Sequence, residues 1–384
     1  MEIYFKEITN YIMKIEIEDY PEDIRDKVEY YLQDGKRLRP ILCLLFSGLK
    51  YNDISDTNKN YKNYENNKSN CIIYKIASCI EQIHCLSLVL DDLPDMDNDS
   101  MRRGKQSFHS KYGNEYTNFF IYYIFNHIGL SLDIVLDSSI DSNCNIDYEI
   151  ASRINKLVTY NLNMLIDGQY NDLFYNISKI DIGIDSNLDS NLDSNIDINL
   201  DNDIKNSLFH NEKDIILNLI GIEHDNNIDV KARLLKNIDL NIKKTSSLFN
   251  LSICTGFLLQ IWLNKSKSNC KLHIETIDEI YNKLSVWSNI LGYMFQISDD
   301  ILDIDDDKEK GSPNLCNIIG KDKTCELLKK GCEWLNDMII TIYDKNNIGL
   351  DLDVDIRLDI GIDDGVDIDI VNEIIKKILK RCEM

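Results

Sequence analysis

The sequence predicts an all-α protein, and three observations lead to that prediction. The 384 residues include only Pro21, Pro40, Pro94 and Pro313 as prolines, so long helices can run without interruption. Apolar residues recur at helical spacing in several long segments. Hydrophobic residues make up 43% and charged residues 28%, which is typical of a soluble globular protein. One helical domain with a substantial core is expected, spanning residues 1–384.

The predicted helices follow one another along the chain. Residues 22–49 are amphipathic, residues 72–92 are almost entirely apolar, and residues 276–304 form another long amphipathic segment. Residues 119–136 are the longest apolar stretch, but they include Asn126, His127 and Asp133. A buried helix is therefore predicted there, and no transmembrane segment.

Three low-complexity segments interrupt this pattern. Residues 51–70 are rich in Asn and Lys, residues 181–206 repeat the unit Ser-Asn-hydrophobic-Asp, and residues 350–370 alternate Asp with aliphatic side chains. The alternation would formally suit a strand, but dense like charge favours surface insertions.

Charge and cysteine usage restrict the function. The formal net charge of −23 argues against nucleic-acid binding, because phosphate backbones attract basic surfaces. Eleven cysteines without any C-x-x-C pair indicate free thiols in a reducing compartment. The acidic N-terminus carries no visible targeting signal, so the expected location is cytoplasmic, or a plastid-like organelle if a leader is missing.

The segment "LVLDDLPDMDNDSMRRGK", residues 88–105, places five aspartates at the end of a hydrophobic helix. His84 and Asp91 are seven residues apart, which puts them on one helix face, and Pro94 should end the helix near Leu93. The chain should then carry Asp95 and Asp97 around a wide turn back toward Asp91. Clustered carboxylates repel one another unless they are solvated or bind hard cations. A calcium-binding loop is a weak alternative, because the sixth position is not Gly and the twelfth is Gln106.

A second acidic cluster, "FQISDDILDIDDD" at residues 295–307, also ends a hydrophobic helix. Asp299 and Asp303 are four residues apart on one face, with Asp300 beside them and Gln296 one turn earlier. We expect the two clusters to face each other across one cavity.

Basic side chains accompany both clusters. Each alone would ordinarily be a solvated surface charge, but with two acidic clusters they indicate a ligand that carries phosphate groups. Mg²⁺ would bridge that ligand to the acids, and Lys and Arg would pair with it directly. The basic residues are Lys36, Arg39, Arg102, Arg103, Lys243 and Lys244.

Five motifs together resemble those of the trans-prenyltransferases, or polyprenyl diphosphate synthases. "DGKRLRP", "DDLPDMDNDSMRRGK", "GQYNDL", "KTSSLF" and "FQISDDILD" occur in the family's order and at roughly its spacing. The form D-D-x-x-x-x-D followed by R-R-G looks most like the farnesyl and geranylgeranyl diphosphate synthases of bacteria and plants.

The resemblance implies an all-helical isoprenoid-synthase bundle around a deep apolar cavity, usually a homodimer. It implies Mg²⁺ as the cofactor and isopentenyl diphosphate and an allylic diphosphate as the substrates. Isopentenyl diphosphate would be held by Lys36, Arg39, His84 and Arg103. The chief Mg²⁺ ligands would be Asp91, Asp97 and Asp299, with Asp92, Asp300 and Asp303 completing the motifs. The allylic diphosphate or its reacting end would be contacted by Arg102, Lys244, Thr245 and Gln296. Catalysis would depend chiefly on Asp91, Asp97, Arg102, Lys244 and Asp299.

The chain departs from the family pattern after the second cluster. Ser312 stands where a diphosphate-binding lysine is expected, Asn317 replaces an Asp, and Asp322 replaces another Lys. These departures allow lower activity or a different lid over the site. The lysines that could substitute are Lys308, Lys310, Lys321 and Lys323.

Product length depends on side chains about one turn before Asp91. Leu86 is smaller than the aromatic residue that would indicate a C15 product, so a C20 geranylgeranyl product is favoured over a longer polyprenyl one. A terpene cyclase would need no isopentenyl diphosphate site, so "DGKRLRP" argues against it. A non-catalytic regulatory subunit is a further alternative, although both acidic clusters are intact.

Overall fold

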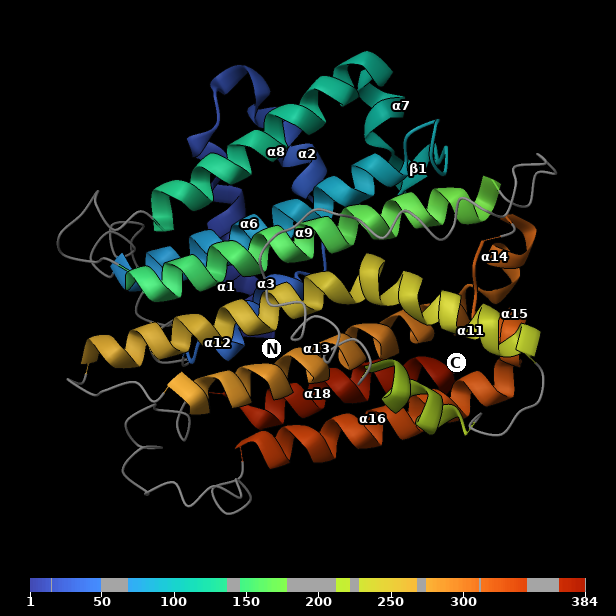
Figure 1. The fold of residues 1–384 in the computed structure, drawn as a ribbon. Coiled ribbons are helices and arrows are strands. Elements are labelled where there is room, and N and C mark those ends of the chain that lie inside the picture. The colour runs from blue at the N-terminus through green and yellow to red at the C-terminus, as the bar shows by residue number, and fades with distance from the viewer. Residues whose placement is uncertain are drawn as a thin grey trace, which may run out of the picture. The chain divides into compact units, whose positions relative to one another are not determined.

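The computed structural model describes residues 1–14, 16–49, 68–136, 146–177, 212–221, 228–267, 274–310, 312–343 and 366–383 (Figure 1). The predicted all-α class is confirmed, since these residues are helical apart from loops and one two-stranded hairpin. By their contacts the residues form two compact units. Unit 1 comprises residues 1–161, 248–281 and 343–370, and unit 2 comprises residues 162–247, 282–342 and 371–384.

The predicted insertion 181–206 lies outside the described residues, as do most of 51–70 and 350–370. The ends of the latter two segments are helical instead. Residues 68–70 belong to the first turn of a long helix, α6, and residues 368–370 to the first turn of another, α18.

Unit 1 begins with short helices and then a long apolar one. The elements are α1 (Glu2–Lys14), the 3₁₀ turns η1 (Glu16–Asp19) and η2 (Glu22–Ile24), α2 (Arg25–Leu32), α3 (Leu38–Phe46) and α6 (Lys68–Asp91). They continue with β1 (Met101–Arg102), β2 (Lys105–Gln106), α7 (Phe108–Tyr112), α8 (Asn114–Leu136) and the first part of α9 (Tyr148–Ile177). Most of α12 (Ser247–Lys267) and the first turns of α13 (Ile274–Leu302) complete it.

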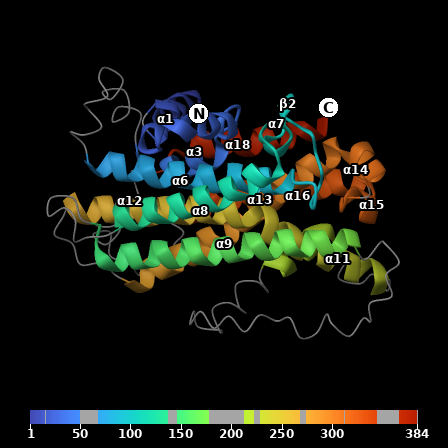
Figure 2. The same cartoon turned by 90° about the horizontal axis from the view of Figure 1, so that it is seen from above.

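Helix α6 is the centre of unit 1. It packs against α3 and α8, which lie on different sides of it (Figures 1 and 2). Its side chains at Ile73, Ile76, Ala77 and Ile80 are buried, as the nearly continuous apolar sequence predicted. This buried helix ends at Asp91, the first residue of the acidic cluster.

The predicted amphipathic segment 22–49 is two helices instead of one. The chain turns between α2 and α3, where Asp34 and Arg37 have φ angles of 63° and 53°. Arg37 is buried and pairs with the buried Glu81 of α6, with Nη1 2.9 Å from Oε1. This ion pair fixes the "DGKRLRP" segment against α6.

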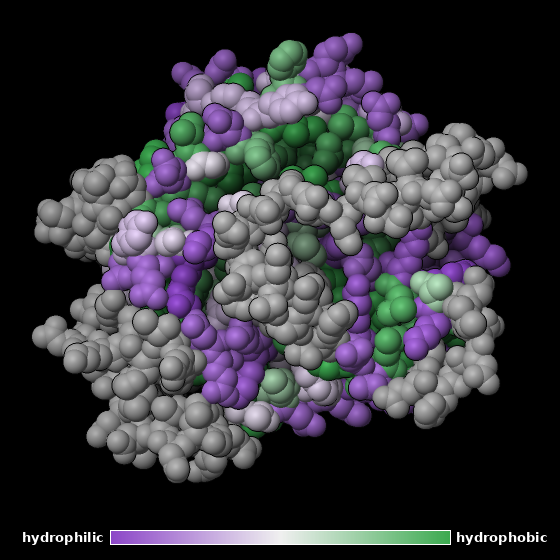
Figure 3. All heavy atoms as spheres, in the orientation of Figure 1, coloured by the Kyte–Doolittle hydropathy of each residue, from purple (hydrophilic) through white to green (hydrophobic). Residues whose placement is uncertain are grey.

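The prediction that residues 119–136 form a buried helix is only half right. They belong to α8, whose side chains at Phe119, Tyr122 and Ile134 are 76%, 74% and 61% exposed. Figure 3 shows apolar residues gathered on the upper part of this face, where Figure 1 places α8. By length and composition, α8 and two other helices in the described ranges could cross a membrane, 69–91 and 230–264.

Unit 2 contains the rest of α9, a helix at 212–220, α11 (Ile228–Asn241), the π turn η4 (Ile242–Ser246) and most of α13. It ends with α14 (Ile304–Lys310), α15 (Cys316–Ile319), α16 (Lys321–Tyr343), α18 (Ile368–Leu379) and η6 (Lys380–Glu383). Trp287 of α13 is fully buried, and its Nε1 donates to the Leu335 carbonyl of α16 at 2.8 Å. This contact holds the helix that carries the second acidic cluster.

Candidate functional site

The first acidic cluster lies where α6 ends. Asp91 and Asp92 are 6% and 2% exposed, whereas Asp97 is exposed. The Asp97 backbone N–H donates to the Asp91 carbonyl at 2.9 Å, so the chain after Pro94 turns back toward the helix end as predicted. The turn therefore brings Asp97 back beside the helical aspartates.

Asp92 is engaged by Arg102. Its Oδ1 accepts hydrogen bonds from Nε of Arg102 at 2.8 Å and from Nη2. Burial raises the pKa of Asp92, and the guanidinium opposes that shift. Asp99, which had no predicted role, lies 3.6 Å from the same guanidinium. Asp92 thus ties the helix end to the hairpin.

The hairpin turn presents Arg103. Arg103 and Gly104 have φ angles of 52° and 78°, the left-handed conformation that a two-residue turn between twisted strands requires. Met101 pairs with Gln106 and Arg102 with Lys105. Because neighbouring residues of the hairpin face different ways, Arg102 meets Asp92 while exposed Arg103 donates to the Gln33 carbonyl at 3.4 Å.

The predicted basic set is partly assembled in unit 1. Nη1 of Arg39 lies 3.2 Å from Nε2 of His84, and its guanidinium stacks over the Phe249 ring at 5.0 Å. Burial lowers the pKa of His84 well below its usual range, and the nearby arginines lower it further. His84 is therefore neutral at pH 7, and Lys36 is exposed at the adjacent loop.

A small cavity of about 40 Å³ lies between α2, α6 and the hairpin. Arg102, Arg103, Lys105 and Gln33 line it together with apolar side chains. The lining also includes the carboxylate of Asp92, which Arg102 already engages.

The second acidic cluster has a partner that sequence reasoning missed. Asp299 on α13 forms an ion pair with Arg381 of η6, whose Nη1 also lies 3.2 Å from Oγ of Ser298. The Arg381 guanidinium stacks over Phe295 at 4.8 Å. Nothing in the sequence near position 381 signals this contact, because the two residues are 82 positions apart.

Asp300 and Asp303 have different environments. Asp300 is buried, and its carboxylate accepts from the Leu315 N–H at 2.8 Å and from Nε2 of Gln296 at 3.0 Å. Burial raises the pKa of Asp300 to about 6. Asp303 is exposed at the end of the helix. Asp300 therefore anchors the loop that follows.

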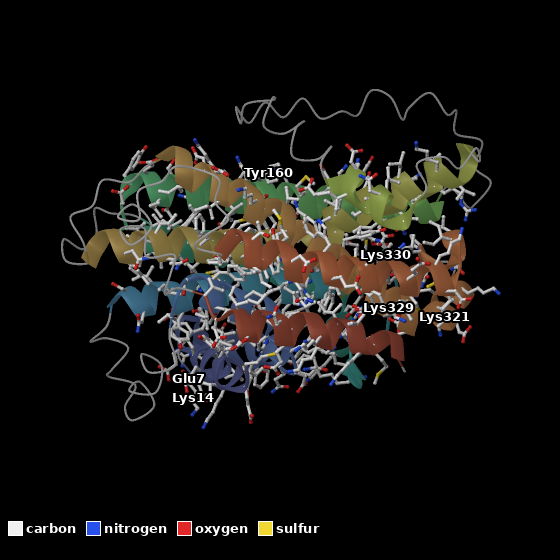
Figure 4. The ribbon with its side chains drawn as sticks, turned by 90° about the horizontal axis from the view of Figure 1, so that it is seen from below. Glu7, Lys14, Tyr160, Lys321, Lys329 and Lys330 are labelled. Atoms are coloured by element: carbon white, nitrogen blue, oxygen red, sulfur yellow. The ribbon has the colours of Figure 1, made fainter. Side chains whose placement is uncertain are left out.

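That loop contains the residues that depart from the family pattern. Buried Asn314 donates to the Asp300 carbonyl and to Oδ2 of Asp307, both at 2.8 Å, while Asn317 and Asp322 are exposed. Lys321 is exposed at the start of α16, with Lys329 and Lys330 further along it (Figure 4). Lys308 and Lys323 are exposed too, and the side chain of Lys310 lies outside the described residues.

The remaining predicted residues meet at η4. Nζ of Lys244 lies 2.6 Å from Oδ2 of Asp172, and Oγ1 of Thr245 donates to Oε1 of Gln296 at 2.8 Å. Asp172 was not among the predicted site residues. Its signal was its place in "GQYNDL", one helical turn after Gly168.

Oxygen donors of the right kind for Mg²⁺ are present at both helix ends. Within the described ranges, no three acidic, His or Cys side chains converge closely enough to hold an ion alone. Mg²⁺ is usually bound through one or two carboxylates together with substrate phosphates and water. Asp91 with Asp97, and Asp299, fit that mode of binding.

Comparisons with known proteins agree with these motifs. The polyprenyl synthetase family model matches residues 21–189. Geranylgeranyl pyrophosphate synthase 10, mitochondrial, of Arabidopsis thaliana is 41% identical over 91 residues, 23% of this chain and 22% of that protein. The chain thus matches about a quarter of the length of such curated relatives.

Solved structures share the fold over nearly the whole chain. A geranyltransferase from Helicobacter pylori matches with a TM-score of 0.58 and 16% identity, covering 98% of this chain and 97% of that one. The same enzyme complexed with magnesium and isoprenyl diphosphate also gives 0.58, with 18% identity and coverage of 99% and 97%. The resemblance to polyprenyl synthetases and the predicted helical bundle are therefore confirmed.

Proposed function

From the match to the polyprenyl synthetase family, we propose that this chain is a Mg²⁺-dependent prenyltransferase. It condenses isopentenyl diphosphate with an allylic diphosphate. The observation that carries the proposal is the arrangement on α6, where His84 with its partner Arg39 precedes Asp91 by two turns. Helix α6 thus carries both His84 of the proposed anion site and the acidic cluster at its C-terminal end.

The basic set suits isopentenyl diphosphate. Arg39 and Lys36 supply positive charge, and Arg103 of the hairpin turn is among the arginines that lower the pKa of His84. Neutral His84 can donate a hydrogen bond to a phosphate oxygen without the cost of burying another charge. A terpene cyclase, which needs no second diphosphate, would gain nothing from these residues.

The acidic residues and the π turn suit the allylic diphosphate. Bound Mg²⁺ would supply positive charge that stabilises the departing pyrophosphate, held by Asp91, Asp97 and Asp299. Arg102 and Lys244 would pair with the same pyrophosphate. Arg102 engages Asp92, and Gln296 engages Asp300. These two aspartates would therefore complete the motifs by supporting the metal-binding carboxylates. Asp303 would lie at the mouth of the site.

Formation of the carbon–carbon bond then depends on how the two substrates are positioned, and no side chain has to act as a base. Loss of the allylic pyrophosphate leaves a carbocation that the double bond of isopentenyl diphosphate attacks. Thr245 and Gln296, joined by their hydrogen bond, would contact the reacting end. The released pyrophosphate can accept the proton lost afterward.

Product length is proposed from α6. Leu86 lies one to two turns before Asp91 and is 5% exposed. A leucine leaves more room for the growing chain than an aromatic side chain would, so we favour a C20 geranylgeranyl product. A longer polyprenyl product is the alternative within the same activity.

The exposed apolar face of α8 supports a homodimer. Exposed aromatic side chains at Phe119 and Tyr122 are costly in water and are typical of protein interfaces. Multi-angle light scattering should give twice the chain mass, and Phe119→Lys with Tyr122→Lys should give the single-chain mass. A single-chain mass for the unaltered protein would remove the dimer from the proposal.

The decisive experiment incubates the protein with Mg²⁺, isopentenyl diphosphate and allylic primers of increasing length, and measures product size. Elongated linear products that require Mg²⁺ are expected. Absence of condensation with every primer would favour the non-catalytic regulatory subunit, and cyclic products from a primer alone would favour the cyclase. The measured chain length decides between C20 and longer products.

A further inference from the structure

The π turn η4 joins α11 to α12 and carries Lys244 and Thr245. The Ser247 N–H donates to the Ile242 carbonyl, which closes a turn one residue wider than an α-helical turn. Such a turn rotates the side chains after it relative to those before it. Because π turns are rare and short, neighbouring elements are expected to hold this one.

Helix α9 approaches the turn through Gly168. A Cβ atom at this position would lie 2.6 Å from the Lys244 backbone N and 2.8 Å from its Cα. One helical turn later on the same face, Asp172 pairs with the Lys244 ammonium at 2.6 Å. The glycine thus allows the approach, and the aspartate directs the lysine side chain.

Helix α13 also approaches η4 through a glycine. A Cβ atom at Gly292 would lie 2.6 Å from Cα of Ser246. Gln296, one turn later, accepts the Thr245 hydroxyl at 2.8 Å and donates to Oδ1 of Asp300 at 3.0 Å. The position of Thr245 is thereby linked to the second acidic cluster.

Two of the other helical glycines provide a contrast. A Cβ at Gly129 on α8 would meet nothing within 4 Å, and one at Gly331 on α16 would meet only the Met294 side chain, which can move. At Gly168 and Gly292 the obstacle is the backbone of the π turn or of the residue at its end. Alanine at either position therefore has to displace the turn.

We propose that Gly168 and Gly292 are positioning residues that clamp η4 from two helices and so aim Lys244 and Thr245 at the allylic diphosphate. The assignment of that ligand rests on the proposed function. The close packing at the turn does not depend on it. Neither glycine touches substrate, because each acts through the backbone of η4.

The test compares Gly168→Ala and Gly292→Ala with the matched controls Gly129→Ala and Gly331→Ala. In the ligand-free protein, hydrogen exchange of the amides at 242–247 should accelerate about tenfold in the clamp variants and stay unchanged in the controls. The KM for the allylic diphosphate should rise about tenfold, because a displacement near 1 Å is enough for such a loss. The KM for isopentenyl diphosphate should stay within about twofold.

Asp172→Asn supplies a second route if an alanine variant fails to fold. It keeps the packing, removes the charged partner of Lys244, and should raise the same KM selectively. The proposal is overturned if exchange and both KM values stay unchanged in the clamp variants, or if both KM values rise equally. Should the unaltered protein condense no primer, the proposed function fails, while the exchange measurement still decides the clamp.

Discussion

The two acidic helix ends are alike in sequence but are held in different ways. At the end of α6, Asp92 is paired with Arg102, ten residues further along on the first strand of the hairpin. At the end of α13, Asp299 is paired with Arg381, 82 residues away on the last helical turn of the chain. In the first cluster the arginine engages an acid that supports the site. In the second it engages the acid expected to bind metal.

This difference suggests separate tasks for the two arginines. The Arg102–Asp92 pair orients the hairpin against the end of α6. Asp299 is one of the proposed Mg²⁺ ligands, so under that proposal Arg381 would have to give way or share the carboxylate.

The largest effects are expected from Asp91→Ala and Asp299→Ala. Each removes a carboxylate that positions charge against the leaving pyrophosphate, so kcat should fall about 10³-fold. Steady-state condensation assays provide the measurement. The exposed aspartates Asp95 and Asp305 serve as matched controls, since Asp95→Ala and Asp305→Ala should keep kcat within about twofold of the original. Equal losses in control and site variants would show that net charge, and not the two positions, matters.

Arg102→Ala should have the next largest effect. The change removes a cation proposed to pair with the allylic diphosphate and also releases buried Asp92, so kcat/KM for the allylic substrate should fall about 10²-fold. Kinetics with each substrate varied in turn would measure this loss. An unchanged kcat/KM would mean that Arg102 only supports the hairpin.

Arg381→Ala should strengthen Mg²⁺ binding, whereas the substitutions above should lower activity. Because an exposed or half-exposed ion pair contributes about 0.2–1 kcal/mol, removing the competitor should tighten Mg²⁺ binding about two- to fivefold. Calorimetric titration of Mg²⁺ in the presence of pyrophosphate provides the measurement. Lys377→Ala removes a charge from the same C-terminal helix without touching Asp299, and should leave the affinity unchanged. Weaker binding in Arg381→Ala would instead make Arg381 a ligand-supporting residue.

His84 should produce the smallest effect, visible as pH dependence. Its pKa in the folded protein lies below the unfolded value of about 6.5, so the unfolded chain binds more protons in the window between the two values. The free energy of unfolding should therefore fall as the pH drops below about 6.5. Replacing His84 by Gln should remove this part of the slope in denaturant unfolding between pH 7.5 and 5.5. An identical slope in both proteins would contradict a lowered pKa of His84 in the folded protein.

The features that could be predicted from the sequence depend on residues close together in the chain. The helix ending at Asp91 follows from an apolar run and Pro94, and the return of Asp97 follows from the same turn. The pairing of Lys244 with Asp172 was not predicted, because the motif "GQYNDL" does not indicate which side chain its aspartate contacts.

Long-range packing could not be predicted in the same way. Arg381 reaches Asp299 only because the C-terminal helix packs beside α13, and no periodicity near residue 381 encodes that arrangement. The exposed face of α8 was misjudged because a uniformly apolar segment does not say which of its sides faces the core. The glycines beside η4 likewise gain their meaning only from what they touch.

The central proposal is that Asp91 and Asp299 are both required for Mg²⁺-dependent binding of diphosphate. A double-mutant cycle with Asp91→Ala, Asp299→Ala and the double variant tests it directly, with Mg²⁺-dependent binding of pyrophosphate measured by calorimetry. If binding requires both residues, either single substitution should weaken it nearly as much as both, because the two losses are then not additive. Losses that simply add, or pyrophosphate binding that does not depend on Mg²⁺, would contradict the account.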